Sequence, residues 1–359
     1  MLLSHGSTYY YRVSCGDVQS STYEFTSWRG ANLWKPVIQI YGSVHSTKAL
    51  RRSALSSDRH PGVILHFDSY SDGDKFSDLI EPVASRIPYI LLPGQEQRVP
   101  QYGLRFQLPG GEFPLNRDSF RTVIGPVQII GFNSYSLTTT HRIQALEWLR
   151  EELTAASNTR RQYPWIIVAS RSLSVCVSRD LQDTDCHQIL ALLRQFDVDL
   201  YLVGESPSYV RSVALGVDGK TDTHGVVILG LSTISSLSAQ IFPTPELIAK
   251  SVNGSSIAVS MKVKSGNKVC IQTDSLSERK MLDQFCMEKS VHTLALVEAR
   301  NGDLYETHVD ITAWLILVIL LGTTFSILLL LRAKLYQRLC IYMESEGGPP
   351  LLFGKMVPV

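Results

Sequence analysis

A repeated unit, an apolar strand followed by a polar loop, most constrains the fold of this chain. Five such blocks occur in order: IQIYGSVH (Ile38 to His45), LHFDSYSDG (Leu65 to Gly73), PYILLPGQEQ (Pro88 to Gln97), WIIVASRS (Trp165 to Ser172) and VDLYLVGESPSYVRS (Val198 to Ser212). Their strands are short, rich in β-branched residues and continuously apolar, as expected for strands covered on both faces. The pattern therefore predicts strands buried inside the domain.

Amphipathic helices alternate with these strands. Further strands are predicted at Val127–Phe132 and Val226–Leu229, and helices from about His141 to Ala156 and from about Thr184 to Phe196. The first helix carries an apolar stripe made by Ile143, Leu146, Leu149 and Leu153. Alternation of strands and helices implies βαβ units and a largely parallel sheet core. Sites in such sheets form at the carboxyl ends of the strands, where the polar loops of the five blocks lie.

The bulk composition excludes one class of partner. The chain has 359 residues, and its 34 Lys and Arg nearly balance its 33 Asp and Glu. No basic stripe accompanies stacked aromatic residues, so no nucleic-acid partner is expected.

One segment, residues 311–331 (ITAWLILVILLGTTFSILLLL), is uncharged and apolar throughout. As a helix its 21 residues span about 30 Å, the thickness of the hydrocarbon core of a bilayer. Three positive charges follow it, at Arg332, Lys334 and Arg338. The positive-inside rule then predicts a single-pass membrane protein with residues 332–359 in the cytosol and the amino-terminal part lumenal or extracellular. Residues 291–310 form the juxtamembrane segment.

The amino terminus complicates this topology, because Met1 to Gly6 shows no signal peptide. Either the apolar helix alone inserts the protein and leaves the amino-terminal part cytosolic, or the true amino terminus is missing. Ser7 to Cys15 and Ser21 to Ser27 favour the second alternative, since they predict two strands joined by a Gly-Asp turn. A lone hairpin is marginal in water. Residues 1–30 are therefore interpreted as the last hairpin of a truncated β domain.

Five of the six cysteines precede the apolar segment, on the predicted oxidising side of the membrane. No spacing selects their pairing. Asn253, in the triplet Asn-Gly-Ser, is a candidate glycosylation site on the same side.

The chain resembles the purple acid phosphatases, a branch of the metallophosphoesterases. The motif blocks carry the resemblance together with stretches outside them, such as LIEPVASRIPYILLPG (Leu79 to Gly94), YGLRFQLP (Tyr102 to Pro109) and the SYxRS that ends at Ser212. The resemblance implies an α/β/β/α sandwich over residues 31–290, preceded by the remnant of a fibronectin-like β domain and followed by the transmembrane helix.

The family's chemistry uses two metal ions bridged by an Asp and held by a further Asp, a Tyr, an Asn and three His, with another His beside the substrate. Iron, zinc or manganese suits such ligands. Most positions that correspond to the family's motifs GDxG, GDxxY, GNHE, VxxH and GHxH carry other residue types: Ser43, Ser69, Gln95, Glu96, Arg171, Glu205 and Pro207. Arginine has no lone pair for a metal, and proline has no donor side chain.

Few ligands remain. Tyr70 matches the family's SYADG, but Asp68 then lies two residues before the tyrosine instead of three. On an ungapped alignment the ligand position is Ser69. Asp68, Tyr70 and Glu205 are the residual metal candidates, and Asp68, Glu96 and Glu205 could hold a single hard cation. Arg171 is a candidate anion site, because a guanidinium group suits phosphate without any metal.

These observations predict a catalytically inactive, purple-acid-phosphatase-like ectodomain on a membrane anchor. It would carry no metal cofactor and act as a binding or scaffold domain for an unknown protein or a phosphate-containing ligand. The alternative is a divergent metal-dependent acid phosphatase, a phosphomonoester hydrolase with a rearranged or mononuclear site, which would need a divalent metal or an iron, zinc or manganese pair.

Overall fold

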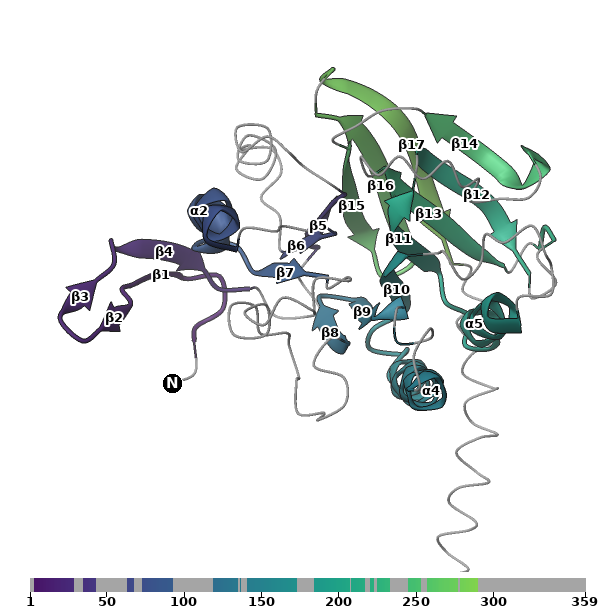
Figure 1. The fold of residues 1–359 in the computed structure, drawn as a ribbon, viewed down its shortest axis with the longest axis horizontal. Coiled ribbons are helices and arrows are strands. Elements are labelled where there is room, and N and C mark those ends of the chain that lie inside the picture. Colours follow the sequence, from purple (N-terminus) through teal and green to yellow (C-terminus); the bar gives the residue numbers. More distant parts are fainter. Residues whose placement is uncertain are drawn as a thin grey trace, which may run out of the picture. The chain divides into compact units, whose positions relative to one another are not determined.

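The computed structural model describes most of the first 289 residues. The described residues are 3–28, 35–42, 63–67, 73–92, 119–134, 136, 141–172, 184–206, 208–216, 220–222, 225–232, 245–252, 257–276 and 278–289. All of them belong to one compact unit, Met1–Ala295. Figure 1 shows its strands and helices.

The larger sheet has seven strands in the order β14-β12-β13-β11-β10-β9-β8. Its strands are β8 (Phe120–Ile124), β9 (Val127–Phe132), β10 (Trp165–Ser172), β11 (Leu200–Ser206), β12 (Tyr209–Leu215), β13 (Val226–Ser232) and β14 (Ile248–Val252). The four central strands β9, β10, β11 and β13 run parallel. The flanking strands β8, β12 and β14 pair antiparallel.

The second sheet has six strands in the order β17-β16-β15-β5-β6-β7. Its strands are β5 (Val37–Tyr41), β6 (Val63–His66), β7 (Tyr89–Leu91), β15 (Ile257–Ser265), β16 (Lys268–Ser275) and β17 (Lys280–Glu288). The strands of the first three sequence blocks, β5, β6 and β7, are parallel, and β15 to β17 are antiparallel. Both sheets therefore have the predicted parallel core with antiparallel strands added at the side.

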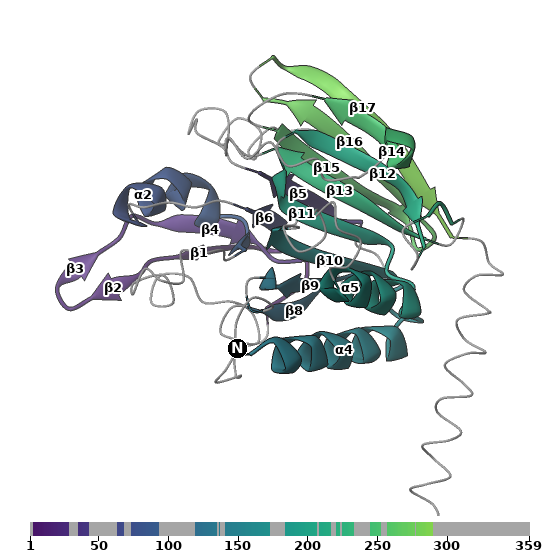
Figure 2. The same ribbon diagram turned by 45° about the vertical axis from the view of Figure 1, so that its right-hand side comes forward.

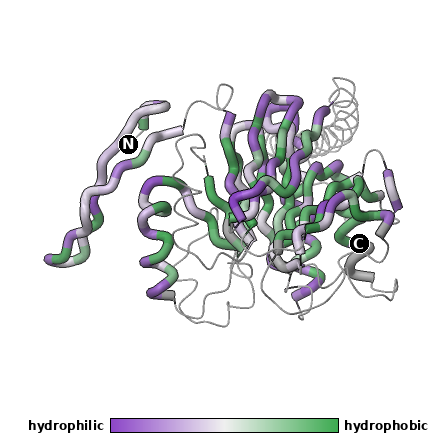
Figure 3. Tube along the Cα trace, turned by 90° about the horizontal axis from the view of Figure 1, so that it is seen from above, coloured by the Kyte–Doolittle hydropathy of each residue, from purple (hydrophilic) through white to green (hydrophobic). Residues whose placement is uncertain are grey.

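Three apolar clusters define four layers. The largest lies between the two sheets and includes Ile38, Ile129 and Leu202. A second lies between the seven-stranded sheet and the helices α4 (Arg142–Asn158) and α5 (Thr184–Gln195), and a third packs α2 (Gly73–Ala84) on the six-stranded sheet. Figure 2 shows α4 and α5 beside the larger sheet, and Figure 3 shows hydrophobic stretches both on central strands and on helices. The described elements thus form an α/β/β/α sandwich.

The described strands after residue 244 complete both sheets. Strand β14 joins the edge of the larger sheet, and β15 lies next to β5. In β16 buried residues alternate with partly exposed ones, as expected for a strand with one covered face.

The predicted amino-terminal hairpin is present. Strands β1 (Thr8–Tyr11) and β4 (Tyr23–Thr26) pair antiparallel, and the short strands β2 (Ser14–Cys15) and β3 (Val18–Gln19) extend the hairpin to its turn. Gly16 in that turn has a φ of 57°, a conformation that glycine adopts readily.

The hairpin is held to the end of α2. The Tyr11 hydroxyl donates to the Ser85 carbonyl oxygen at 2.8 Å, and Arg86 pairs with Glu24 at 2.7 Å. The hydroxyl of Tyr23 also donates to the Glu81 carboxylate.

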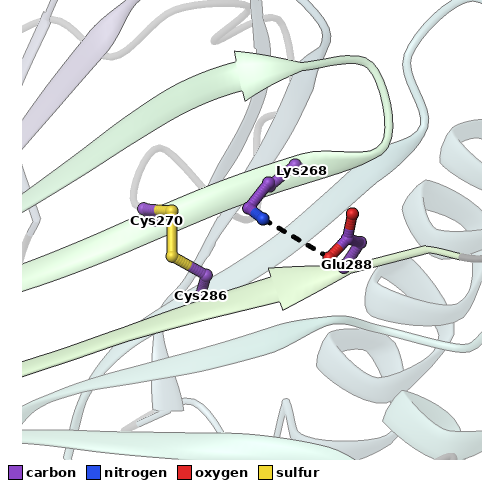
Figure 4. Close-up of a disulfide and its surroundings, with 4 residues drawn as sticks. All are labelled: Lys268, Cys270, Cys286 and Glu288. Carbon is purple, nitrogen blue, oxygen red and sulfur yellow. Dashed lines mark hydrogen bonds and ion pairs between the residues drawn. A yellow bond between two sulfur atoms is a disulfide. The ribbon is translucent and has the colours of Figure 1, made fainter.

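One disulfide, which the sequence left undetermined, links neighbouring strands. Cys270 in β16 is directly opposite Cys286 in β17, and their sulfur atoms are bonded at 2.06 Å. Figure 4 shows the bridge beside the Lys268–Glu288 ion pair, 3.4 Å long. Cys15 is a free, exposed thiol.

No helix among the described residues is both long enough and apolar enough to cross a bilayer. The predicted anchor at 311–331, the juxtamembrane segment 291–310, the tail 332–359 and Asn253 lie outside the described residues.

Candidate functional site

The candidate site lies where β6 of one sheet meets β11 of the other at their carboxyl ends. Phe67 directly follows β6, and its amide donates to the Tyr41 carbonyl oxygen at 2.9 Å. Gly204 lies in β11, at the start of the fifth block's motif. A Cβ atom placed on Gly204 would lie only 2.4 Å from Cδ1 of Phe67, so the phenyl ring packs directly on the glycine backbone.

The Phe67 side chain is buried in the apolar core. Only 1% of it is exposed, and it belongs to the cluster between the two sheets. A phenyl ring has no atom that can ligate a metal or accept a proton. At this point of the candidate site the two sheets are therefore joined by an apolar contact.

Phe67 occupies the sequence position of a metal ligand in the family motif. The family motif GDxxY places its aspartate three residues before the tyrosine, and in this chain the residue three positions before Tyr70 is Phe67. Sequence reasoning did not single out Phe67, because it took Asp68 as a residual ligand and Ser69 as the replaced ligand position. The match of SYSDG to the family's SYADG was the available signal.

Two other site positions are placed by their strands. Arg171 lies in β10 and Glu205 in β11, and the parallel register puts Ser172 opposite Glu205. The structure thus brings the fourth and fifth blocks together on neighbouring strands. Ser43, Asp68, Ser69, Tyr70, Gln95, Glu96 and Pro207 lie outside the described residues.

A buried hydroxyl pair lies beside the fourth block. Ser170, directly before Arg171, is 2.6 Å from the Tyr201 hydroxyl, oxygen to oxygen. Burial raises the pKa of Tyr201 to about 12, although the hydrogen bond with Ser170 works in the opposite direction. Tyr201 therefore stays protonated near neutral pH, and the pair offers neither a general base nor an activated nucleophile.

A carboxylate of the smaller sheet joins the two sheets through the SYxRS stretch that ends the fifth block. Asp283 in β17 accepts from the Tyr209 hydroxyl at 2.8 Å and from Arg211 Nε at 2.8 Å. Burial by itself raises the pKa of Asp283, but the hydrogen bonds from Arg211 and Tyr209 outweigh it and lower that pKa overall. The Arg211 guanidinium also lies 4.4 Å from the centre of the Phe285 ring. This network holds β12 to β17.

A second buried network contains two cations and one carboxylate. Lys289 Nζ donates to Asp199 at 2.9 Å and to the Pro164 carbonyl oxygen, and it lies 4.8 Å from the centre of the Trp165 ring. Arg160, 3% exposed, lies 3.8 Å from the same carboxylate and donates to the Phe196 carbonyl oxygen. Burial lowers the pKa of Lys289, and Asp199 opposes that shift. The network fixes the start of β10 and β11 to the end of β17.

Neither network forms a metal centre. Among the described residues no three His, Cys, Asp or Glu side chains are grouped so that they could hold a metal ion. In the described part of the candidate site, Phe67 does not fit the dinuclear metal centre that the resemblance implies, because a metal pair needs oxygen or imidazole ligands and a phenyl ring supplies neither.

Comparisons with known proteins agree with this fold. The chain is 28% identical over 242 residues to acid phosphatase type 7 of Mus musculus, covering 58% of this chain and 55% of the mouse protein. The purple acid phosphatase PPD1 from seeds of Lupinus luteus superposes with a TM-score of 0.63 at 15% identity, over 77% of this chain and 58% of the lupin chain. The chain has a purple-acid-phosphatase-like metallophosphoesterase fold.

The predicted resemblance to the purple acid phosphatases is thereby confirmed. A further structural neighbour is GAP50, described as the anchor in the inner membrane complex of Plasmodium. Its TM-score is 0.51 at 13% identity, over 72% of this chain and 91% of the GAP50 chain. No family model matches the sequence. The chain spans about half the length of the curated relatives it matches.

Proposed function

We propose that this chain is a purple-acid-phosphatase-like protein without phosphatase activity, which acts as a binding or scaffold domain. The buried phenyl ring of Phe67 carries the proposal. It stands three residues before Tyr70, where the family motif has a metal-ligating aspartate, and it fills the contact with Gly204. An apolar ring packed there supplies no ligand and leaves little room for one.

The replacements in the other blocks support the same proposal. Ser43 occupies the position of an aspartate in the family motif, and Arg171 and Pro207 occupy the positions of histidines. None of the three restores a neutral nitrogen or a charged oxygen ligand. Because these ligands are replaced, we infer that the chain holds no metal pair. Catalysis through a bridging hydroxide depends on both metals, so we expect no phosphatase activity.

Anion binding is the activity that these replacements retain. The guanidinium group of Arg171 suits phosphate without a metal. We therefore propose that a phosphate-containing ligand or a protein partner, and not a hydrolysed substrate, occupies this edge of the sheets.

A turnover assay tests the proposal. The purified full chain should not hydrolyse a general phosphomonoester at acid or neutral pH, with or without added iron, zinc or manganese, while a purple acid phosphatase assayed in parallel does. Inorganic phosphate should raise the thermal midpoint of the chain, and Arg171→Met should remove that rise. Turnover that scales with added metal would overturn the proposal.

We also propose a single-pass topology with the folded unit lumenal or extracellular. The length of segment 311–331 and the charges after it support a membrane anchor. The Cys270–Cys286 disulfide supports an oxidising compartment for the folded unit, and GAP50 is described as a membrane-complex anchor. Protease digestion of intact vesicles tests this, since the folded unit should be protected and residues 332–359 should be removed. Digestion of the folded unit in sealed vesicles would contradict it.

We further propose a domain order in which the hairpin within residues 1–30 belongs to a fibronectin-like β domain and residues 31–290 form the phosphatase-like domain. The contacts of the hairpin with α2 support a hairpin that packs on the second domain.

The relatives named acid phosphatase favour a second candidate, a divergent phosphomonoester hydrolase. In that case Asp68, Tyr70 and Glu205 would bind one metal. Asp68→Ala should then abolish turnover and metal binding together, whereas under the first proposal there is no turnover for Asp68→Ala to remove.

A further inference from the structure

A groove of about 530 Å³ lies between the amino-terminal hairpin and the turn that follows α2. Its apolar walls are formed by Leu3, Tyr11, Phe25, Trp28, Ile87 and Pro88. Leu3 is 45% exposed and Trp28 38% exposed, so large apolar side chains face open space. The volume falls within the range of about 300–1,000 Å³ that is typical of sites for small molecules.

The groove is separate from the candidate phosphatase site. Helix α2 begins after the loop that leaves the carboxyl end of β6, and it ends before β7 begins. Residues 84–88 therefore lie at the amino-terminal edge of the parallel strands, and Pro88 accepts a hydrogen bond from the Ile64 amide at 2.9 Å. Family sites form at the opposite edge.

The walls of the groove are fixed by contacts that use their polar groups. Tyr11 packs edge to face on Phe25 with ring centres 6.0 Å apart, and its hydroxyl donates to the Ser85 carbonyl oxygen. The Ser27 hydroxyl donates to the Ser7 carbonyl oxygen, and the His5 ring nitrogen Nδ1 lies 3.1 Å from the Trp28 carbonyl oxygen. A ligand rich in polar groups would find few free partners here, so an apolar body fits better.

The charges of the groove favour an anionic end on that body. Among the described residues that line it, the ionisable side chains are Arg86, His5 and Tyr11, and none is a carboxylate. One terminal nitrogen of Arg86 pairs with Glu24 at 2.7 Å, just outside the lining. Both partners of this pair are about half exposed, at 50% and 43%, so the pair is weak and the guanidinium group keeps further N–H donors.

We propose that this groove binds a single-chain amphiphilic carboxylate, such as a fatty acid. Its chain lies along the walls at Leu3, Phe25, Trp28 and Ile87, and its carboxylate reaches Arg86, where it competes with Glu24. Burial of the chain supplies the affinity. The charge-assisted hydrogen bond to Arg86 selects the acid over a neutral alcohol of the same length.

Photo-crosslinking of the full chain tests the location. The probe is a fatty carboxylate with a photoreactive diazirine near the end of its chain, and labelled peptides are mapped by mass spectrometry. The label should lie within residues 3–28 and 84–88, and excess dodecanoate should displace it. Labelling confined to 311–331, or not displaced by dodecanoate, would overturn the proposal.

Calorimetric titration with dodecanoate and with dodecanol tests the chemistry. Arg86→Met should weaken dodecanoate binding about fivefold, as expected for a partly exposed charge-assisted contact, and leave dodecanol binding unchanged. Glu24→Gln should strengthen dodecanoate binding about twofold, because it removes the competing carboxylate.

The two variants control for each other, because both remove the Arg86–Glu24 ion pair that helps to hold the hairpin. If loosening of the hairpin were the cause, both would weaken binding. Opposite effects on dodecanoate support the proposal, and weakening by both, or equal affinities for the acid and the alcohol, refutes it. Arg12→Met, the same substitution at an exposed hairpin position outside the groove, should change nothing.

Discussion

The carboxyl edge of the sheets differs in its chemistry from the two seams between the sheets, which are the polar networks around Asp283 and Asp199. At the edge, Phe67 and Gly204 make an apolar contact at the point where the family motif implies metal ligands. At the seams, Asp283 and Asp199 each accept hydrogen bonds from basic side chains. These two networks hold the sheets together through ion pairs and hydrogen bonds of their own, so we expect the fold to be stable without a metal centre.

The largest expected effect is at the Asp199 seam. Asp199→Ala leaves the buried Arg160 and the largely buried Lys289 without their shared carboxylate. Removal of one partner of a buried ion pair typically costs about 3 kcal/mol or more of the free energy of unfolding. Urea unfolding of the full chain measures this. Glu288→Ala in the exposed Lys268–Glu288 pair is the control, with an expected change below about 0.5 kcal/mol. Equal losses of unfolding free energy in the two variants would refute the prediction that the Asp199 network contributes more to stability than the surface pair.

The apolar contact at the carboxyl edge comes next. Phe67→Ala should lower the free energy of unfolding by about 3 kcal/mol, the usual cost of truncating a buried phenylalanine. Gly204→Ala should cost about 1–3 kcal/mol, because its new methyl group collides with the Phe67 ring.

The two substitutions together test whether the ring and the glycine touch. In the double variant the methyl group added at position 204 enters the space left by the phenyl ring, so the combined loss should be smaller than the sum of the two. Additive losses would show that Phe67 and Gly204 are not in contact.

The disulfide is expected to contribute a similar or smaller amount. Cys270 and Cys286 are 16 residues apart, and closing a loop of about that length stabilises by about 3 kcal/mol in the chain-entropy account. The Cys270→Ser, Cys286→Ser double variant should lose up to that amount, measured by urea unfolding without reductant. Cys15→Ser should be neutral, because that thiol is exposed and unbonded. A stability unchanged by reductant in the natural chain would contradict this prediction.

The smallest effect is the acid dependence due to Asp283. Its pKa in the folded chain lies below the ordinary value of 3.8, because the hydrogen bonds from Arg211 and Tyr209 outweigh its burial. The resulting stability is present above pH 3.8 and is lost as the pH falls through the folded pKa. Asp283→Asn should therefore destabilise the chain by about 1–2 kcal/mol at neutral pH and by less in acid. A difference between the two proteins that grows toward acid pH would have the wrong sign.

The parallel strands could be predicted from the sequence, because continuous apolar runs such as those of β10 and β11 are typical of strands with both faces covered. The prediction of which residues form the apolar stripe of α4 was partly wrong. Leu149 and Leu153 are buried, but Ile143 is 68% exposed, and Ala145 and Trp148 are buried in its place. Small alanines let the helix approach the sheet, and hydrophobic periodicity alone does not weigh them.

Strands β14 to β17 were missed for a different reason. Strand β14 has no fully buried residue, and β16 alternates between buried and half-buried positions. Strand β15 begins with five buried residues, but Ser260 and Lys262 interrupt its apolar side chains, and β17 is mostly polar and exposed, so no continuous apolar run marks these strands. Their pairing with β12 and β5 depends on contacts between residues far apart in the chain, such as Ser260 with Gln39. Phe67 was missed because a core residue and a replaced ligand look alike until the packing is known.

Metal content is the most direct test of the central proposal, that this chain carries no metal-dependent chemistry. The full chain, purified without chelator after expression with added iron, zinc and manganese, should contain far less than one metal ion per chain by elemental analysis. Its thermal midpoint should be unchanged by chelator. One or two tightly bound ions per chain, whose removal lowers the midpoint, would contradict the account.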